Sequence, residues 1–328
     1  MPNALTRAIA KADSILLTTP DLDGDAVGAI AALGRAIAVR WPDKRVIVLA
    51  DEPLPARYAF LVPPDLPFQM ADAVPVSPVD LALVIDGDPA RFQAVQPHFA
   101  AARQRGMVDH HKSSDLGDLD VGLLDPLAAS TTELVLRLCD HWGVALDPAL
   151  AEAIFTGMAF DTSVFRYRLT RPRTLRAAAR LLETGIDHAQ IVDRVLMSQP
   201  VERVRLRGQM IMSMQLAAEG RLAWASLTAA QVDAAETGGL VDDLVFIEGV
   251  EIGLLAVERG DGRVKVSLRS RGGIDVSALA RRLSPHGGGH ARAAGATLRA
   301  SLDDATERAV VAALAALGPP VNDGAAGV

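Results

Sequence analysis

The sequence has one cysteine, few aromatic residues and no long hydrophobic run, and each scarcity excludes a class of protein. Cys139 is the single cysteine in 328 residues, so neither an intrachain disulfide framework nor a cysteine-rich zinc site can form. No apolar stretch approaches the ~20 residues that cross a bilayer, and the N-terminus lacks the basic segment and apolar run of a secretory leader. We therefore expect a cytoplasmic protein that does not enter a membrane.

Charge and aromatic content argue against a protein that holds long nucleic acids. Lys and Arg number 33 against 40 Asp and Glu, which gives a net charge of −7, so the chain as a whole does not attract a polyanion. Aromatic residues make up 4% of the chain, which leaves little surface on which a long strand could stack its bases. Any nucleic-acid ligand is therefore expected to be short.

The length of 328 residues is about twice the ~150 residues of a typical domain and predicts two domains. The first two thirds alternate short apolar runs with amphipathic segments, a pattern typical of a parallel sheet covered by helices. The strands expected there are Ser14–Thr19, Arg45–Ala50, Leu81–Ile85 and Gly106–Val108, and the helices are Ser130–Trp142, Pro148–Phe160 and Arg173–Glu183. Further strands are expected at Arg221–Leu227, Glu251–Glu258 and Arg263–Arg269.

These patterns predict an α/β fold: a doubly wound, mostly parallel N-terminal sheet joined by a helical linker to a smaller mixed α+β domain. The expected bounds are 1–186 for the first domain, 187–220 for the linker, 221–317 for the second domain and 318–328 for a disordered tail.

Acidic and imidazole side chains follow three of the expected strands. They are Asp23 and Asp25 after the first strand, Asp86 after the third, and Asp109, His110 and His111 after the fourth. The carboxyl ends of neighbouring parallel strands share one crevice, so we expect these side chains to converge, together with Asp161 at the end of a hydrophobic helix. So many carboxylates repel one another without cations, and a mixed Asp/His set favours Mn²⁺ somewhat over Mg²⁺.

Taken singly, each motif has an ordinary explanation as a solvated turn or a capped loop, and it is the set that predicts a metal site. The Asp21–Asp25 run is not an EF-hand loop, because Ala32 stands where that loop needs a bidentate Glu. A serine nucleophile elbow and the glycine-rich dinucleotide and nucleoside-triphosphate loops are absent from the sequence. Hydrolysis assisted by metal ions remains.

The second domain carries a local basic region. Between Asp261 and Arg299 there are eight Lys or Arg and two acids. A strand at Arg263–Arg269 would place its charged residues on one face and its apolar residues on the other. The run Gly287, Gly288, Gly289 and His290 follows, and consecutive glycines let backbone N–H groups approach a phosphate. A plain solvated face is the alternative explanation.

The ordered motifs resemble the DHH phosphoesterase superfamily, in the subgroup that pairs a DHH domain with a DHHA1 domain. The resemblance covers nearly the whole chain and rests on PDLDGDAVGAI (20–30), LVIDGDPARF (83–92), VDHHKSS (108–114), GMAFDTSVFRY (157–167), KVSLRSRGGIDVSALA (265–280) and GGGHARAAGA (287–296). Within the superfamily the chain is most similar to the bacterial nano-RNase and 3′-phosphoadenosine-5′-phosphate (PAP) phosphatase group. That group hydrolyses very short RNAs, linear dinucleotides and PAP.

The resemblance implies two metal ions, most often Mn²⁺ with Mg²⁺ as the alternative, which activate a bridging water for attack on phosphorus. It assigns Asp23 to the first ion, Asp25, His110 and Asp161 to the second, and Asp86 as the bridge. His111 would face the substrate phosphate, with Asp109 orienting its neighbour. In the second domain it assigns the substrate phosphate to Arg269 and His290, and we expect Ser270, Gly287, Gly288 and Gly289 to bind substrate beside them.

One position departs from the family pattern, because Thr19 stands where a histidine ligand is usual. Either Asp21 compensates, or the first ion binds weakly and arrives with substrate. Two other functions stay open: an exopolyphosphatase or pyrophosphatase, and a nucleotide-binding regulatory protein with impaired turnover. As partners we expect short single-stranded RNA, dinucleotides or nucleotide phosphates as substrate, no membrane, and at most a second copy of the chain in a homodimer.

Overall fold

The computed structural model describes residues 3–232 and 237–318. The chain divides into two compact units, Met1–Ser198 and Gln199–Val328. Residues 319–328, most of the expected disordered tail, lie outside the described residues. Within the described ranges, no helix combines the length and the apolar character needed to cross a membrane.

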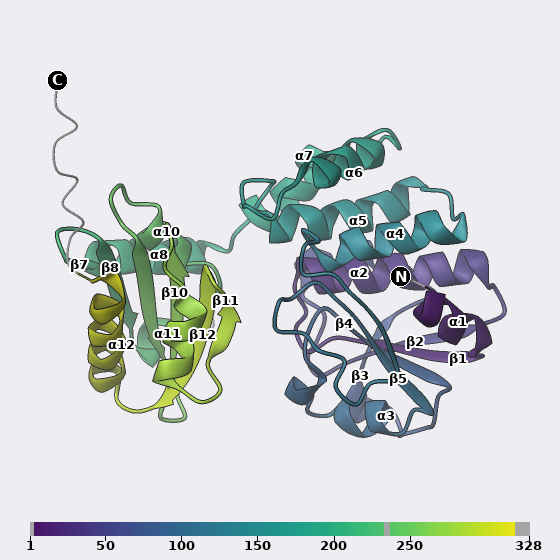
Figure 1. The fold of residues 1–328 in the computed structure, drawn as a ribbon, viewed down its shortest axis with the longest axis horizontal. Helices are drawn as coiled ribbons and strands as arrows, with labels where there is room; N and C mark the ends of the chain where they lie inside the picture. The colour runs from purple at the N-terminus through teal and green to yellow at the C-terminus, as the bar shows by residue number, and fades with distance from the viewer. Residues whose placement is uncertain (1–2, 233–236, 319–328) are drawn as a thin grey trace. The chain divides into compact units, whose positions relative to one another are not determined.

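The first unit is built on a six-stranded sheet whose strands all run parallel, in the order β3-β2-β1-β4-β5-β6 (Figure 1). The strands are β1 (Ser14–Thr18), β2 (Arg45–Ala50), β3 (Phe68–Met70), β4 (Leu81–Ile85), β5 (Gln104–Asp109) and β6 (Val121–Leu124). The predicted α/β class is thereby confirmed. The chain moves outward from β1 through β2 to β3 and then returns to place β4 beside β1. The crevice at this change of direction is where open α/β sheets bind ligands.

Helices cover both faces of this sheet, and its strands are therefore buried on each side. Along β1, Ile15 and Leu17 belong to the core that α2 and α5 share, whereas Leu16 belongs to a second core with Phe99 of α3. The helices and short helical turns of the first unit are α1 (Asn3–Lys11), α2 (Gly24–Arg40), η1 (Ala56–Leu61), η2 (Ala71–Ala73), η3 (Pro89–Arg91), α3 (Gln96–Ala100), α4 (Thr131–Trp142), α5 (Pro148–Asp161), α6 (Pro172–Leu182), α7 (His188–Val192) and η4 (Asp193–Met197).

Glycine permits the close packing of α2 on α5. A Cβ added at Gly28 would lie 2.5 Å from the carbonyl oxygen of Ala153, and one at Gly24 would lie 2.8 Å from the ring of Phe160. Real Cβ atoms do not approach so closely, so larger residues would force the helices apart. This packing brings the N-terminal end of α2 against the C-terminal end of α5, where Asp161 lies.

The second unit contains a mixed sheet in the order β11-β12-β10-β9-β8-β7. Its strands are β7 (Gln215–Ala217), β8 (Leu222–Leu227), β9 (Ile252–Glu258), β10 (Arg263–Ser270), β11 (Gly288–His290) and β12 (Ala293–Arg299). Strands β8 and β9 run parallel and the other neighbours run antiparallel. The helices are α8 (Val201–Ser213), α9 (Ala229–Val232), α10 (Val241–Val245), α11 (Val276–Leu283) and α12 (Leu302–Leu317).

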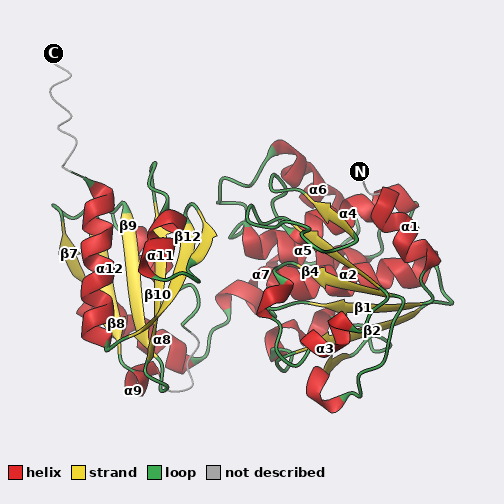
Figure 2. Cartoon of the chain, turned by 60° about the horizontal axis from the view of Figure 1, so that its bottom comes forward, coloured by secondary structure: helices red, strands yellow, loops and turns green. Residues whose placement is uncertain are grey.

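The two faces of this sheet have separate cores. Residues of α11 and α12 pack on one face, as Figure 2 shows, and residues of α8 and α10 pack on the other. The expected linker, residues 187–220, is shared between the units. Its α7 and η4 belong to the first unit, whereas α8 buries Leu206 and Met210 in the second.

Candidate active site

Asp23 and Asp25 lie where β1 gives way to α2. Asp23 is the N-cap of α2, and its Oδ1 accepts hydrogen bonds from the backbone N–H groups of Asp25 and Ala26, both at 3.0 Å. Asp25 is in the first turn and fully buried. Its carboxylate accepts from the first turn of α4: Thr131 N at 2.5 Å, Thr132 N at 3.0 Å and Thr132 Oγ1 at 2.8 Å. Two helix N-termini therefore surround this carboxylate.

Asp86 directly follows β4 and turns the chain sharply. Its backbone has a φ of 59°, and Gly87 follows with a φ of 153°. A Cβ on Gly87 would lie 2.4 Å from Cγ of Pro20, so only glycine fits there. The turn directs the buried Asp86 carboxylate at Thr131, whose Oγ1 donates to it at 2.8 Å. A left-handed non-glycine residue in such a place is typical of a functional site.

His110 is buried at the end of β5 and links two carboxylates. Its Nδ1 lies 3.3 Å from the carbonyl oxygen of Ala128, while its Nε2 lies 2.9 Å from Asp161 Oδ2 and 3.7 Å from Asp86 Oδ1. Because the backbone carbonyl fixes Nδ1, the atom presented to the carboxylates is Nε2. Metal-ligating histidines are usually held in this way.

His111 is held by its neighbour Asp109. Asp109 Oδ1 accepts from the backbone N–H of His111 at 3.1 Å and lies 2.7 Å from His111 Nδ1, and Ser114 Oγ donates to Asp109 Oδ2. Burial alone would raise the pKa of Asp109, but the hydrogen bonds from His111 and Ser114 lower it. The His111 side chain remains 34% exposed, so the imidazole is fixed in direction and still reaches solvent.

The carboxylates crowd one another. Burial, together with the charge of Asp161, raises the pKa of Asp23 and of Asp25 to about 7. Burial and the neighbouring Asp25 and Asp23 raise the pKa of Asp86 well above its ordinary range. Burial would lower the pKa of His110, but its hydrogen bond to Asp161 and the surrounding carboxylates raise it to about 11. The site is therefore built for more positive charge than the protein supplies.

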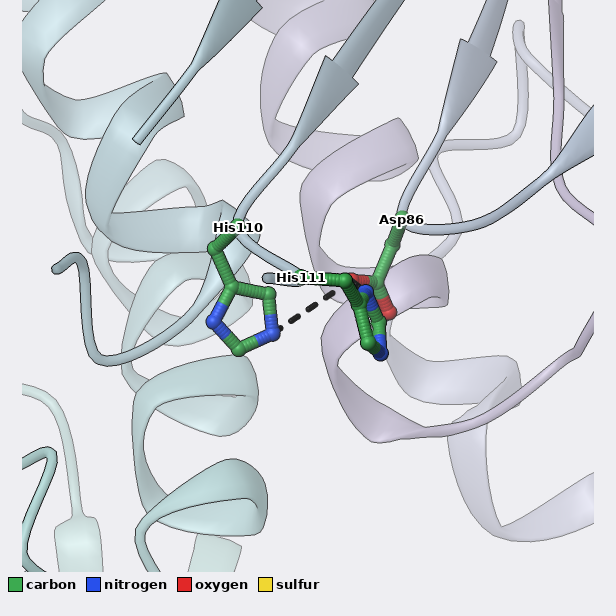
Figure 3. A group of neighbouring side chains, drawn as sticks. All are labelled: Asp86, His110 and His111. Atoms are coloured by element: carbon green, nitrogen blue, oxygen red, sulfur yellow. Dashed lines mark ion pairs between the residues drawn. The ribbon is translucent and has the colours of Figure 1, made fainter. Parts of the chain in front are cut away.

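The donor set fits a divalent metal ion. Two groups each bring three ligand atoms within 4.8 Å of one another: Asp25, His110 and Asp161, and Asp86, His110 and His111. Figure 3 shows the imidazoles of the second group beside the Asp86 carboxylate. Five of the side chains expected after three strands and one helix thus come together: Asp25, Asp86, His110, His111 and Asp161. Among the described residues, neither group includes Asp23, whose carboxylate caps α2.

Thr19 and Asp21 are engaged within the chain. Thr19 is buried and its Oγ1 donates to the carbonyl oxygen of Asp21 at 2.9 Å. The Asp21 carboxylate accepts hydrogen bonds from both terminal nitrogens of Arg91, and Arg91 Nη2 lies 2.7 Å from Oδ1.

In the second unit, the alternation expected along β10 is confirmed. Val264, Val266 and Leu268 are buried, and the charged residues between them are exposed or half-buried. Arg269 Nε donates to Asp242 Oδ1 of α10 at 2.6 Å, with both side chains partly exposed.

The other residues expected at a phosphate in this unit have unequal surroundings. Ser270 is buried and donates to the carbonyl oxygen of Ile274 at 2.8 Å, so its hydroxyl holds the following turn. A Cβ on Gly287 would lie 2.1 Å from Ala280 O, and Gly289 has a φ of 130°, whereas Gly288 faces open space. His290 is half-buried at the end of β11.

Sequence reasoning missed Thr131 and Thr132 as part of the site. The helix they begin was expected at Ser130–Trp142, and Ser130 caps it in the structure. Nothing in the pattern shows that these threonines face carboxylates from α2 and β4, since that contact depends on how the helices pack.

Comparisons with known proteins identify a matching family and similar proteins. Residues 220–317 match the DHHA1 domain model. The chain is 34% identical over 304 residues to the bifunctional oligoribonuclease and PAP phosphatase NrnA of Thermus thermophilus, covering 90% of this chain and 88% of that protein. It is 27% identical over 312 residues to NrnA of Bacillus subtilis, covering 91% and 93%.

Solved structures show the same fold. An exopolyphosphatase-related protein from Bacteroides fragilis has a TM-score of 0.82 at 26% identity and covers 94% of each chain. RecJ of Thermus thermophilus in complex with Mn²⁺ has a TM-score of 0.55 at 15% identity, covering 95% of this chain and 54% of RecJ. The chain belongs to the DHH/DHHA1 phosphoesterases, in their nano-RNase and PAP phosphatase-like group, and is accordingly an enzyme.

Proposed function

We propose that the protein hydrolyses phosphate esters in short oligoribonucleotides, including linear dinucleotides, and in PAP, with two divalent cations of which Mn²⁺ is preferred. The observation that carries the proposal is the pair of ligand groups that share His110 at the carboxyl ends of β4 and β5. The names of the Thermus and Bacillus relatives support the substrate class.

Each candidate site residue of the first unit has a role in the proposed chemistry. Asp25, His110 and Asp161 would hold one ion, Asp23 the other, and Asp86 would face both. When bound, such a pair of ions neutralises phosphate charge and lowers the pKa of water. Of the chain's own groups, the partly exposed His111 would donate a hydrogen bond to a phosphate oxygen, and its contact with Asp109 would keep it in that direction.

The second unit would bind the substrate phosphate. The expected residues are Arg269, Ser270, Gly287, Gly288, Gly289 and His290. Arg269 would exchange its contact with Asp242 for a phosphate oxygen. The buried hydroxyl of Ser270 would shape the loop, and Gly288 would offer backbone that no side chain covers.

The test is hydrolysis by the purified protein with Mn²⁺ of a panel of di- to decanucleotides, PAP and polyphosphate. We expect product from dinucleotides and PAP, rates that fall with length, and no product in EDTA. The control pair is Asp86→Asn, which should abolish turnover, and Asp80→Asn, which changes a carboxylate held by Ser14 outside the site and should not.

Other outcomes would contradict the proposal. Hydrolysis of polyphosphate with rejection of dinucleotides would make the protein an exopolyphosphatase. Tight binding of dinucleotides without product at any Mn²⁺ concentration would instead indicate a regulatory protein.

A further inference from the structure

We propose that Thr131 and Thr132, the first two residues of α4, are positioning residues that hold the carboxylates of Asp86 and Asp25 in the geometry that binds metal. This inference rests on the proposed function and adds two residues that the family motifs above do not contain. Both threonines are fully buried.

Asp25 is held by three donors from α4. Thr131 N donates to Oδ2, and Thr132 N and Thr132 Oγ1 both donate to Oδ1, at distances between 2.5 and 3.0 Å. With donors on both oxygens, the carboxylate cannot rotate without breaking hydrogen bonds. The direction of its remaining lone pairs is therefore fixed.

Thr131 also reaches a second carboxylate. Its Oγ1 donates to Asp86 Oδ1 at 2.8 Å, while its backbone N–H donates to Asp25. One residue thus ties together carboxylates that follow β4 and β1, two strands that lie side by side. This link fixes the spacing between the two ligand groups.

The Thr131 hydroxyl is not needed to begin α4. Ser130 is the N-cap, and its Oγ accepts from Glu133 N at 3.1 Å. Glu133 is anchored in turn by Thr174 Oγ1 at 2.9 Å and by Arg173. Because the cap is complete without it, the Thr131 hydroxyl is free to serve Asp86. The Thr132 hydroxyl serves Asp25 and also lies 2.7 Å from Ser130 Oγ, so it links the cap to the carboxylate.

The space around the contact is closed by α5. A Cβ on Gly157 would lie 2.3 Å from Asp25 Oδ1 and 2.5 Å from Thr132 Oγ1. Only a residue without a side chain leaves room for the hydrogen-bonded pair. The backbone of α5 at Gly157 therefore packs directly against the hydrogen-bonded Asp25 and Thr132.

The experiment measures Mn²⁺ binding by calorimetry without substrate, in wild type, Thr131→Val, Thr131→Ser and Thr132→Val. We expect Thr131→Val to weaken Mn²⁺ binding about 10–100-fold, as loss of groups that orient metal ligands does. Thr131→Ser keeps the hydroxyl and should restore binding to within about threefold of wild type. Thr132→Val should lose less than Thr131→Val, because two backbone donors still hold Asp25.

The matched control is Thr156→Val on α5, a buried threonine whose hydroxyl donates to Glu152 O of its own helix. Melting in EDTA checks that each variant folds, and Thr131→Ala replaces Thr131→Val if the valine does not. If the wild type binds Mn²⁺ and hydrolyses substrate, and Thr131→Val binds Mn²⁺ as tightly as Thr156→Val, this inference alone is overturned. A wild type that binds no Mn²⁺ overturns the proposed function and this inference together.

Discussion

Asp86→Asn should abolish turnover and at the same time make the metal-free protein more stable. Asp86 is 5% exposed, and it is surrounded by Asp25, Asp23 and Asp161, whose charges with burial raise its pKa. An acid whose pKa rises on folding opposes folding at every pH above its unfolded value. Asparagine has the same shape, tolerates a φ of 59° and still accepts from Thr131.

The size of the effect follows from removing a buried like charge. A buried polar group without a compensating partner costs about 1–3 kcal/mol, and a charged group at least as much. Each kcal/mol moves the melting temperature of a domain of this size by about 2–4 °C. We therefore expect a gain of roughly 2–12 °C at pH 8 in EDTA. The gain should shrink as the pH falls through the unfolded pKa of 3.8, and it vanishes below that value, where the Asp86 carboxyl is protonated in both states.

The assay is thermal melting in EDTA, with Asp80→Asn as a matched control of opposite sign. Hydrogen bonds from Ser14 lower the pKa of Asp80, so its charged form favours folding above the unfolded pKa, and Asp80→Asn should melt lower at pH 8. If Asp86→Asn also melted lower than wild type at pH 8, the idea of crowded, uncompensated carboxylates would be refuted.

Three further predictions concern the ions and the substrate. Mn²⁺ affinity should rise with pH between 6 and 8 and proton release should accompany binding, because burial raises the pKa of Asp23 and Asp25 to about 7; calorimetry in buffers of different ionisation enthalpy measures this, and a pH-independent affinity would contradict it. Thr19→His should lower the Mn²⁺ concentration for half-maximal rate, and an unchanged value would mean that another group already fills the place. Arg269→Ala should raise KM for a dinucleotide about 10–100-fold and leave the Mn²⁺ affinity unchanged. Arg263→Ala on the same strand should leave KM unchanged.

The strands that carry the site could be predicted with little error. Four predicted strands of the first unit correspond to β1, β2, β4 and β5, because buried parallel strands are continuous apolar runs bounded by turns. The short edge strands β3 and β6 were not predicted. Three or four residues carry no periodicity of their own, so their pairing depends on the neighbour already present.

The sequence by itself determined which acidic and imidazole side chains could meet at the edge of the sheet. Asp86 and His110 follow apolar runs, and parallel strands must deliver their carboxyl ends to one crevice. Only the tertiary structure decided which oxygen each donor meets. It placed Thr131 on two carboxylates and paired Asp21 with Arg91. Such contacts join residues far apart in the chain, and their geometry depends on how closely the helices pack, which no local pattern encodes.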